Sequence, residues 1–562
     1  MNDNSRGLYA KMKLLGQQVR AGLQQWVESR QDVVGAAACV ATFGAFGALI
    51  VQWHNNSQSA LVPLFDGCRH VSGVCNLASF LRTNGLGDLL SHEFVGDVMI
   101  PYFVMSLPTL LVGFGRTAFG LGWVLCLLAL LSVLFTTVSR KNRFWELLLA
   151  GSIMLAIGVF PAEHGGARDT RLDLLALTAA SIAVVFVVGG RYRGALAVAT
   201  IAMFLKSSVL FLLVPLLVIG LIVYRPSFAV LIPATRGQWA LLVATVGLLF
   251  VFFWEYLEVT LFYYLMATGG DSAGERVGNL VSELPTSLLW GLMYYPWVLL
   301  QHTNFWLTLA VPVAVFYERK RIADDGAGAS RLGIYTLACG VFTYLLMASH
   351  PLHSRVLIVY FLPFSVLAAL YLTRLVNDHA GIWVSRYLAA GLSIAVLALT
   401  PASPPPLQGD EAVAKGLIFE HAHKIAEFVD ERPSQKREDV FILGNFVVHQ
   451  GRMLHAIDAY RNLIYEHTRS TDLQITGGEI GYTSEWQARM RAVLRPGINL
   501  LIVQEYPHLE KVPFGREIWD AVQEARVRTP HCLDEVAPPV DMPHYGRQEV
   551  YVLRRGEACE WE

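Results

Sequence analysis

Charged residues are scarce in this chain, and their scarcity excludes an ordinary soluble fold. Asp, Glu, Lys and Arg make up 16% of the 562 residues, whereas hydrophobic residues make up 54%. About a quarter of the residues in a soluble globular chain are charged. The apolar residues are also gathered into runs near the ~20-residue length that crosses a bilayer. We therefore predict an integral membrane protein.

Two motifs that define enzyme classes are absent. The sequence contains no Walker phosphate loop and no His-Glu-x-x-His helix, so ATP-driven chemistry and a zincin centre lack support. The net charge of −1 gives no basic footprint for nucleic acid. The first apolar run follows about thirty polar and basic residues, so we expect no cleaved signal peptide. Partners are expected in the bilayer.

The apolar runs predict an α-helical polytopic protein with about eleven transmembrane helices. This count treats residues 101–122 as a re-entrant or interfacial segment, because counting them as a crossing would put three later basic clusters on the outer side. The expected spans are residues 33–51, 121–138, 146–160, 173–189, 194–206, 208–224, 238–258, 305–317, 332–348, 354–373 and 383–400.

Loop charge sets the predicted orientation. Basic residues precede the first span and recur in later loops, so the positive-inside rule places the N-terminus and those loops in the cytoplasm. These residues are Arg6, Lys11, Lys13, Arg20, Arg30, Arg140, Lys141, Arg143, Arg191, Arg193, Arg225, Arg236, Arg319, Lys320 and Arg321. We divide the chain into a cytoplasmic segment (1–32), a transmembrane catalytic domain (33–400) with external loops 53–119 and 257–304, a proline-rich linker (401–409) and an outer domain (410–562).

The outer domain has the pattern of a small soluble α/β domain. An amphipathic helical pattern covers residues 410–431, and short β-rich runs follow at 440–443, 499–503 and 549–553. The glycine-rich stretch 477–482 lacks the spacing of a phosphate-binding fingerprint and is interpreted as a turn.

The cysteines give a separate test of the topology. Three of them lie in predicted spans, and the other four, Cys68, Cys75, Cys532 and Cys559, lie on the predicted outer side. Disulfides persist in oxidising compartments, so we expect Cys68 to pair with Cys75 and Cys532 with Cys559. The alternative is four free thiols in a reducing compartment, which would overturn the topology.

Candidate functional residues gather at span ends on the predicted outer face, where charged groups are costly and often functional. Asp66 and Asp97 are candidate general bases, since carboxylates suit proton removal from an acceptor. Lys206 and Arg355 suit a lipid phosphate. Plain loop charges, and a lysine that reaches toward the interface, are the alternatives. Further candidates around this face are Glu163, His164, Arg168, Asp169, Arg171, Asp173, His350 and His353.

Two further features have ambiguous interpretations. His350 and His353 would suit a metal ion, yet no third ligand can be assigned. Glu255 lies among aromatic residues that are typical of a membrane interface, and a sugar- or lipid-stacking role is the alternative. We predict no resident cofactor, and a divalent metal stays open.

The order of these features resembles the C-type (GT-C) superfamily of membrane glycosyltransferases, over most of residues 30–400. Arg171-Leu172-Asp173-Leu174-Leu175 is similar to the acidic head of a span in the protein-mannosyl and aminoarabinose transferase branch. The Met203 to Ser208 stretch is similar to its lysine turn, and the Ser354 to Pro363 stretch to its late arginine-to-proline span. The outer domain resembles that of arabinofuranosyl-transferring members. Members usually carry an acidic pair after the first span, whereas Asp66 stands alone here.

The resemblance implies a bacterial inner-membrane enzyme with its active site and outer domain facing the periplasm. It would transfer a sugar from a polyprenyl phosphate to a glycan, lipid or protein acceptor, with inversion. Asp66 is the first-choice base and Asp97 the second, while Asp173 would shape the site. Lys206, Arg355 and His353 would bind the phosphate. Substrate-binding candidates are Glu163, His164, Arg171 and Glu255.

Two other functions stay open at this point. An O-antigen polymerase or ligase also acts on lipid-linked glycans, usually through arginine and histidine in a large external loop. Residues 257–304 contain a single arginine, Arg276, and a single histidine, His302. A transporter or flippase would be expected to show repeated halves with interrupted helices, and we find no such repeat.

Overall fold

A computed structural model describes part of the chain, and every structural statement below concerns that part. The described residues are 32–54, 66–84, 99–112, 116–138, 142–162, 165–227, 288–325, 328–348, 356–400, 440–444, 498–505, 515–542, 546–554 and 559, with scattered positions at 230–247 and 417–428.

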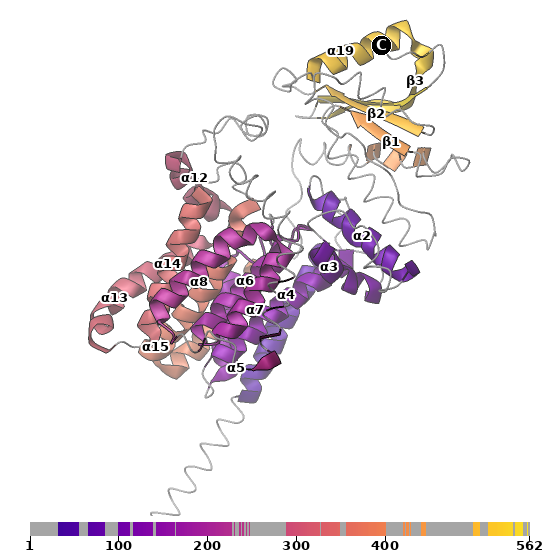
Figure 1. The fold of residues 1–562 in the computed structure, drawn as a ribbon. Helices are drawn as coiled ribbons and strands as arrows, with labels where there is room; N and C mark the ends of the chain where they lie inside the picture. The colour runs from indigo at the N-terminus through magenta and orange to yellow at the C-terminus, as the bar shows by residue number, and fades with distance from the viewer. Residues whose placement is uncertain are drawn as a thin grey trace, which may run out of the picture.

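The described N-terminal two thirds of the chain are helical. Figure 1 shows α4 to α8 and α12 to α15 gathered in one bundle, with α2 and α3 at its edge. The elements are the helix Asp32–His54, α2 (Asp66–Asn84), α3 (Met99–Val112), α4 (Arg116–Thr137), α5 (Arg143–Ile157), α6 (Asp173–Val188), α7 (Tyr192–Leu205), η3 (Ser207–Val209), α8 (Leu210–Tyr224), α12 (Leu288–His302), η4 (Phe305–Leu309), α13 (Ala310–Asp325), α14 (Gly328–Ala348), η6 (Val356–Phe361) and α15 (Leu362–Leu399).

Several of these helices have the composition of membrane spans. Among the described residues, four helices are long and apolar enough to cross a membrane: Asp32–His54, Thr117–Thr137, Arg331–Ala348 and Ile358–Leu399. A bent pair, Gly291–Gln301 with Phe305–Glu318, would make a fifth, and four shorter apolar helices accompany them. These helices support the prediction of a membrane protein, while the count of about eleven spans stays a prediction.

Two predicted interruptions fall on described helices. Helix α3 has 14 residues, as does α7. Its length of about 21 Å therefore does not decide whether residues 101–122 cross the membrane, and that assignment stays a prediction. Helix α15 has 38 residues and breaks at Gly381, where φ is 77° and ψ is 169°. Glycine adopts this backbone conformation without the clash that a Cβ would cause. The break lies between the two predicted spans 354–373 and 383–400.

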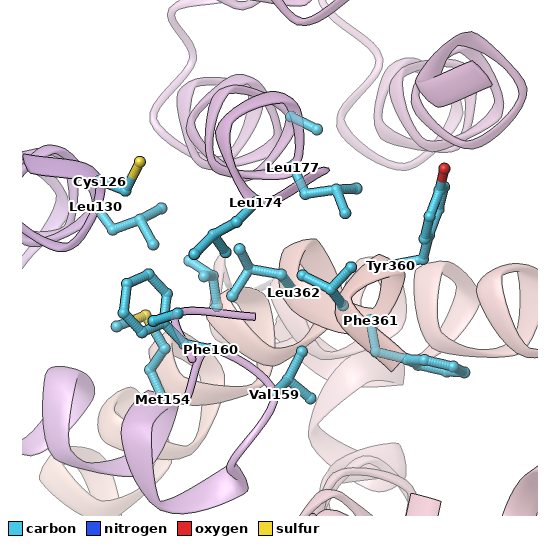
Figure 2. Packing of buried hydrophobic residues seen from close by; sticks show 14 of the residues in the cluster. Cys126, Leu130, Met154, Val159, Phe160, Leu174, Leu177, Tyr360, Phe361 and Leu362 are labelled. Carbon is cyan, nitrogen blue, oxygen red and sulfur yellow. The ribbon is translucent and has the colours of Figure 1, made fainter. Parts of the chain in front are cut away.

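The apolar core lies where α4, α5, α6 and the start of α15 meet. Figure 2 shows Leu130, Met154, Leu174 and Leu362 from these helices packed together. Phe160, from the loop after α5, is fully buried in the same cluster. The core therefore fixes both the loop 158–172 and the first turn of α6.

The C-terminal part contains a four-stranded mixed sheet in the order β1-β2-β4-β3. The strands are β1 (Val440–Gly444), β2 (Ile498–Glu505), β3 (Leu533–Met542) and β4 (Gly546–Leu553), and α19 is Gly515–Arg528. Strand β2 pairs parallel with β1 and antiparallel with β4. The three predicted β-rich runs coincide with β1, β2 and β4. Strand β3 was not predicted, because Pro538 and Pro539 interrupt its pattern; an edge strand with register shifts accommodates them.

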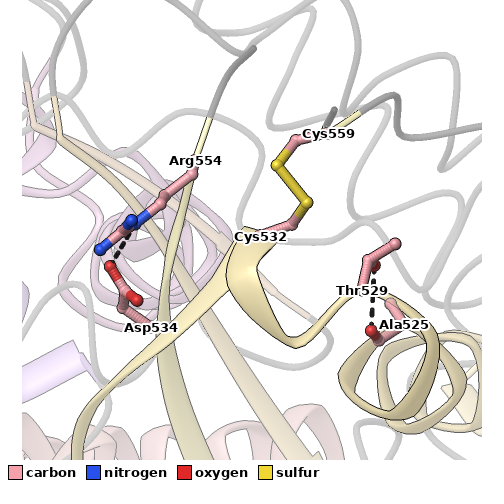
Figure 3. The surroundings of a disulfide bond; sticks show 6 residues. All are labelled: Ala525, Thr529, Cys532, Asp534, Arg554 and Cys559. Carbon is pink, nitrogen blue, oxygen red and sulfur yellow. Dashed lines mark hydrogen bonds and ion pairs between the residues drawn. A yellow bond between two sulfur atoms is a disulfide. The ribbon is translucent and has the colours of Figure 1, made fainter. Parts of the chain in front are cut away.

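The two predicted disulfides have opposite outcomes. Cys532 and Cys559 are bonded, with their Cα atoms 5.5 Å apart (Figure 3). The Cys68–Cys75 pair is wrong, because Cys75 is a buried free thiol. Both residues lie in α2, where seven residues correspond to about 10.5 Å of helical rise, beyond the ~7 Å Cα separation that a disulfide can bridge. The cysteine support for an outer location therefore rests on the Cys532–Cys559 bond.

Candidate functional site

The loop 158–172 is shaped by close backbone contacts and anchored by two side chains. Gly158 ends α5 with a left-handed φ of 87°, and a Cβ at Gly166 would lie 2.6 Å from the carbonyl oxygen of Ala162. The ring of His54 is hydrogen-bonded through Nε2 to the carbonyl of Ala167 at 2.9 Å. Trp123 Nε1 donates to the carbonyl of Asp169, also at 2.9 Å. The described parts of the loop, residues 158–162 and 165–172, therefore present a fixed backbone to the head of α6.

Within this loop, Asp169 serves the local turn. Its carboxylate accepts hydrogen bonds from the backbone N–H groups of Gly165 and Thr170, each at 2.7 Å. Arg171 Nε lies 3.5 Å from the same carboxylate. Burial raises the pKa of Asp169, while Arg171 and the backbone donors favour the charged form. A carboxylate with these partners holds the loop and is a poor candidate for a general base.

The next acidic residue along the chain, Asp173, forms an ion pair with Lys206. Asp173 is the first residue of α6, and its side chain is 4% exposed. Lys206 follows α7 in an extended conformation, with φ of −161° and ψ of 115°, which separates α7 from η3 and α8. Its side chain is 38% exposed. The buried carboxylate therefore holds a cation that a ligand can reach.

Polar groups from four segments lie around this pair. Ser208 Oγ and Tyr360 Oη are hydrogen-bonded at 3.1 Å, which joins η3 to η6. Tyr360 is also within electrostatic reach of Lys206 and Asp173. His70, on α2, and Arg171 are also within electrostatic reach of Asp173. The site thus combines loop 158–172, α2, η3 and η6, which are far apart in the sequence.

Sequence reasoning found part of this cluster. It singled out Asp173, Lys206 and Arg171, which the structure brings together. It missed His70 as a candidate, although His70 follows Asp66 by one helical turn, a spacing that puts both on one face of α2. Ser208 and Tyr360 lie in the two stretches, Met203 to Ser208 and Ser354 to Pro363, that resemble the family, but the sequence assigned no role to either residue.

The remaining predicted site residues are not placed around this pair. Asp66 is the first residue of α2, and only its backbone position is described. The others lie outside the described residues, so their roles stay predictions. They are Asp97, Glu163, His164, Glu255, His350, His353 and Arg355.

Among the described residues, a group of three side chains close enough to share a metal ion occurs far along the chain from this pair. It consists of His531, Cys532 and Cys559. The two sulfur atoms are already bonded to each other, so they are not thiolate ligands. The described residues therefore assign no metal to the Asp173–Lys206 pair.

Comparisons with known proteins point to a fold. No protein-family model matches the sequence, and no curated protein matches it. A crystal structure of ArnT from Cupriavidus metallidurans bound to undecaprenyl phosphate is similar, with a TM-score of 0.51 and 13% identity over 92% of this chain and 97% of that one. The apo structure of the same protein gives a TM-score of 0.47 and 13% identity over 94% and 98%.

The likeness to the undecaprenyl-phosphate-bound structure shows the fold class. ArnT is an aminoarabinose transferase of the C-type superfamily, the branch from which the sequence resemblance was drawn. This chain therefore shares the fold of that ArnT structure, and the resemblance expected from the sequence is confirmed at the level of the fold. At 13% identity, the comparison assigns no substrate to this chain.

Proposed function

We propose that this chain is a glycosyltransferase that moves a sugar from a polyprenyl phosphate to a glycan, lipid or protein acceptor at the outer face of a bacterial inner membrane. The observation that carries the proposal is the Asp173–Lys206 pair, in which a partly exposed ammonium group is held by a buried carboxylate. A similar structure, that of ArnT, contains undecaprenyl phosphate.

In this proposal Lys206 binds the phosphate of the donor. Its ammonium group neutralises charge that develops on the leaving phosphate, an interaction that is strongest in a water-poor site. Asp173 acts as a positioning residue, because its buried carboxylate contacts Lys206 and is too enclosed to reach an acceptor. Ser208 and Tyr360 lie beside the same position. Arg355 and His353 are proposed as further phosphate ligands.

The proposed reaction is a direct displacement at the anomeric carbon. An acceptor oxygen forms a bond to that carbon while the bond to the phosphate oxygen breaks, so polyprenyl phosphate leaves with the electron pair and the configuration inverts. A carboxylate removes the acceptor proton. Asp66 is the first candidate for this base and Asp97 the second. Arg171, Glu163, His164 and Glu255 are proposed to contact the substrates.

Transfer assays with purified full-length protein test the function. We expect activity with a monosaccharide on a polyprenyl monophosphate, and little with an oligosaccharide on a polyprenyl diphosphate. The opposite donor preference would favour a polymerase or ligase, and substrate flux in vesicles without a covalent product would favour transport. Full activity in a variant with both Asp66→Asn and Asp97→Asn would overturn the assignment of the base.

Reporter fusions test the proposed orientation. Alkaline phosphatase fused after residue 562 should be active, because its disulfides form in the periplasm, and a reporter that requires the cytoplasm should be silent at the same position. The reverse pattern would contradict the proposed location of the C-terminal domain.

A further inference from the structure

A cavity adjoins the loop 158–172. It has a volume of about 580 Å³ and is lined by the end of α5, the start of that loop, the α12–η4 junction and the last turns of α15. Its size falls within the ~300–1,000 Å³ range of small-molecule sites. Asp173, Lys206 and Tyr360 are not among its described lining residues, so the Asp173–Lys206 pair lies outside it.

Part of the cavity wall is apolar. Leu155 and Leu392 line it from α5 and α15. The lining side chains Leu300, Trp306 and Leu399 are largely exposed. Exposed apolar side chains near a helix end, tryptophan among them, are typical of the membrane interface. The mouth is therefore suited to a molecule that enters from the bilayer and has a hydrocarbon part.

The polar end of the cavity carries a positive charge. Of the described lining residues, Arg168 is the ionisable one. Its guanidinium group lies 4.4 Å from the ring centroid of Trp53, which holds it in place by a cation–π contact. Asn304 lies nearby in the lining and donates from Nδ2 to the carbonyl of Ala156 at 3.1 Å. An anion is the complement of this end.

We propose that the cavity binds an anionic phospholipid, with the headgroup phosphate at Arg168 and an acyl chain along the exposed apolar side chains Leu300, Trp306 and Leu399. The planar guanidinium donates paired hydrogen bonds to phosphate oxygens. The apolar part of the wall favours a ligand with a hydrocarbon part over a wholly soluble one. A lipid bound here contacts the loop that leads to Asp173, and it stabilises the folded state by binding to it.

Native mass spectrometry of the purified full-length chain tests this site without relying on transfer activity. The protein is exchanged into detergent that contains either phosphatidylglycerol or phosphatidylcholine. We expect preferential retention of phosphatidylglycerol. Arg168→Gln should weaken that retention roughly tenfold, which is the order of a lost charge-assisted hydrogen bond, and leave phosphatidylcholine unchanged. Ala395→Phe, which fills the cavity from α15, should weaken retention of both lipids.

Matched variants serve as controls. Arg191→Gln removes another arginine that stacks on an aromatic ring, at 5.9 Å from Phe186, and lies outside the lining. Ala398→Phe adds the same bulk at an exposed position on α15. Both should behave like the unaltered protein.

Three results would overturn the proposal. The first is equal retention of the two lipids by the unaltered protein. The second is loss of retention in Arg191→Gln or Ala398→Phe as large as in Arg168→Gln or Ala395→Phe. The third is Arg168-dependent binding of glycerol phosphate as strong as that of the lipid, which would identify a soluble phosphate ligand. If Arg168→Gln does not fold, Ala395→Phe decides, since it keeps Arg168 and Trp53 in place.

Discussion

Two buried carboxylates, one in each part of the molecule, have contrasting partners. Glu549, on β4, is 2% exposed. It accepts hydrogen bonds from Gln523 at 2.6 Å, Tyr551 at 2.6 Å and Arg547 at 2.9 Å. Asp173, at the head of α6, is 4% exposed and pairs with Lys206, which is 38% exposed.

The difference separates a structural carboxylate from one suited to a site. The acceptor positions of Glu549 are occupied by donors from its own sheet and from α19, so a ligand would have to displace part of the fold. Asp173 instead pairs with Lys206, whose side chain is 38% exposed. The exposure of the cations does not separate the two carboxylates, because Arg526 and Arg547 beside Glu549 are each 40% exposed. The number of hydrogen-bond donors from the fold that hold Glu549 does.

The largest expected effect is that of Lys206→Gln. Loss of the ammonium group should lower kcat/KM for the polyprenyl-phosphate donor by roughly 10²- to 10³-fold, the range for removal of one group that stabilises developing charge. Lys206→Arg should keep part of the activity. Arg225→Gln, at the far end of α8, is the control and should retain full activity. Equal loss in Arg225→Gln would show a general folding defect.

Asp173→Asn should have the next largest effect, and it should depend on Lys206. If Asp173 acts by positioning the ammonium group, the double variant with Lys206→Gln should be about as active as Lys206→Gln alone, since groups that act as a unit are non-additive. Steady-state kinetics of the four proteins in this cycle give the answer. Multiplicative losses would show that Asp173 acts independently of Lys206.

The disulfide variant tests the C-terminal part of the molecule. Serine at both Cys532 and Cys559 should lower the unfolding free energy of the C-terminal sheet by about 3 kcal/mol, because the bond closes a sequence separation of 27 residues. Donor binding should be unchanged. Alkylation of denatured, unreduced protein followed by peptide mass spectrometry should label Cys75 and spare the bonded pair; protection of Cys75 would contradict its free state.

Glu549→Gln should give the smallest effect of the four. It leaves Arg547 and Arg526 without the full carboxylate charge, and both are 40% exposed, so solvent limits the loss to about 1–3 kcal/mol of sheet stability. Glu535→Gln is the control, because Glu535 is 40% exposed and lies 4.0 Å from Arg526. Thermal unfolding of both variants should separate them. A larger loss of stability in Glu535→Gln than in Glu549→Gln would refute the structural role assigned to Glu549.

The sequence predicted the apolar helices well because hydrophobic length and loop charge are local signals. It predicted Asp173 and Lys206 for a similar reason, since an isolated charge in an apolar run stands out. It could not predict their pairing with each other across 33 residues, nor the approach of His70 from α2, because these contacts depend on tertiary packing. The Cys68–Cys75 prediction failed because it rested on the expected compartment of the two cysteines and did not consider that a helix would separate them.

The C-terminal sheet shows the same division. Strands β1, β2 and β4 have apolar, β-branched runs that are visible locally, whereas β3 pairs with β4 through register shifts around its prolines. An edge position tolerates those prolines, and edge position is a property of the assembled sheet. The Cys532–Cys559 bond was predicted from the expected compartment, and its geometry became apparent only in the fold.

A structure of the purified chain with undecaprenyl phosphate would test the central claim most directly. The account predicts a phosphate oxygen within about 2.7–3.2 Å of Lys206 Nζ, with Asp173 still buried behind it. A phosphate bound away from Lys206, for example at Arg168, would contradict the assignment of the Asp173–Lys206 pair as the donor site.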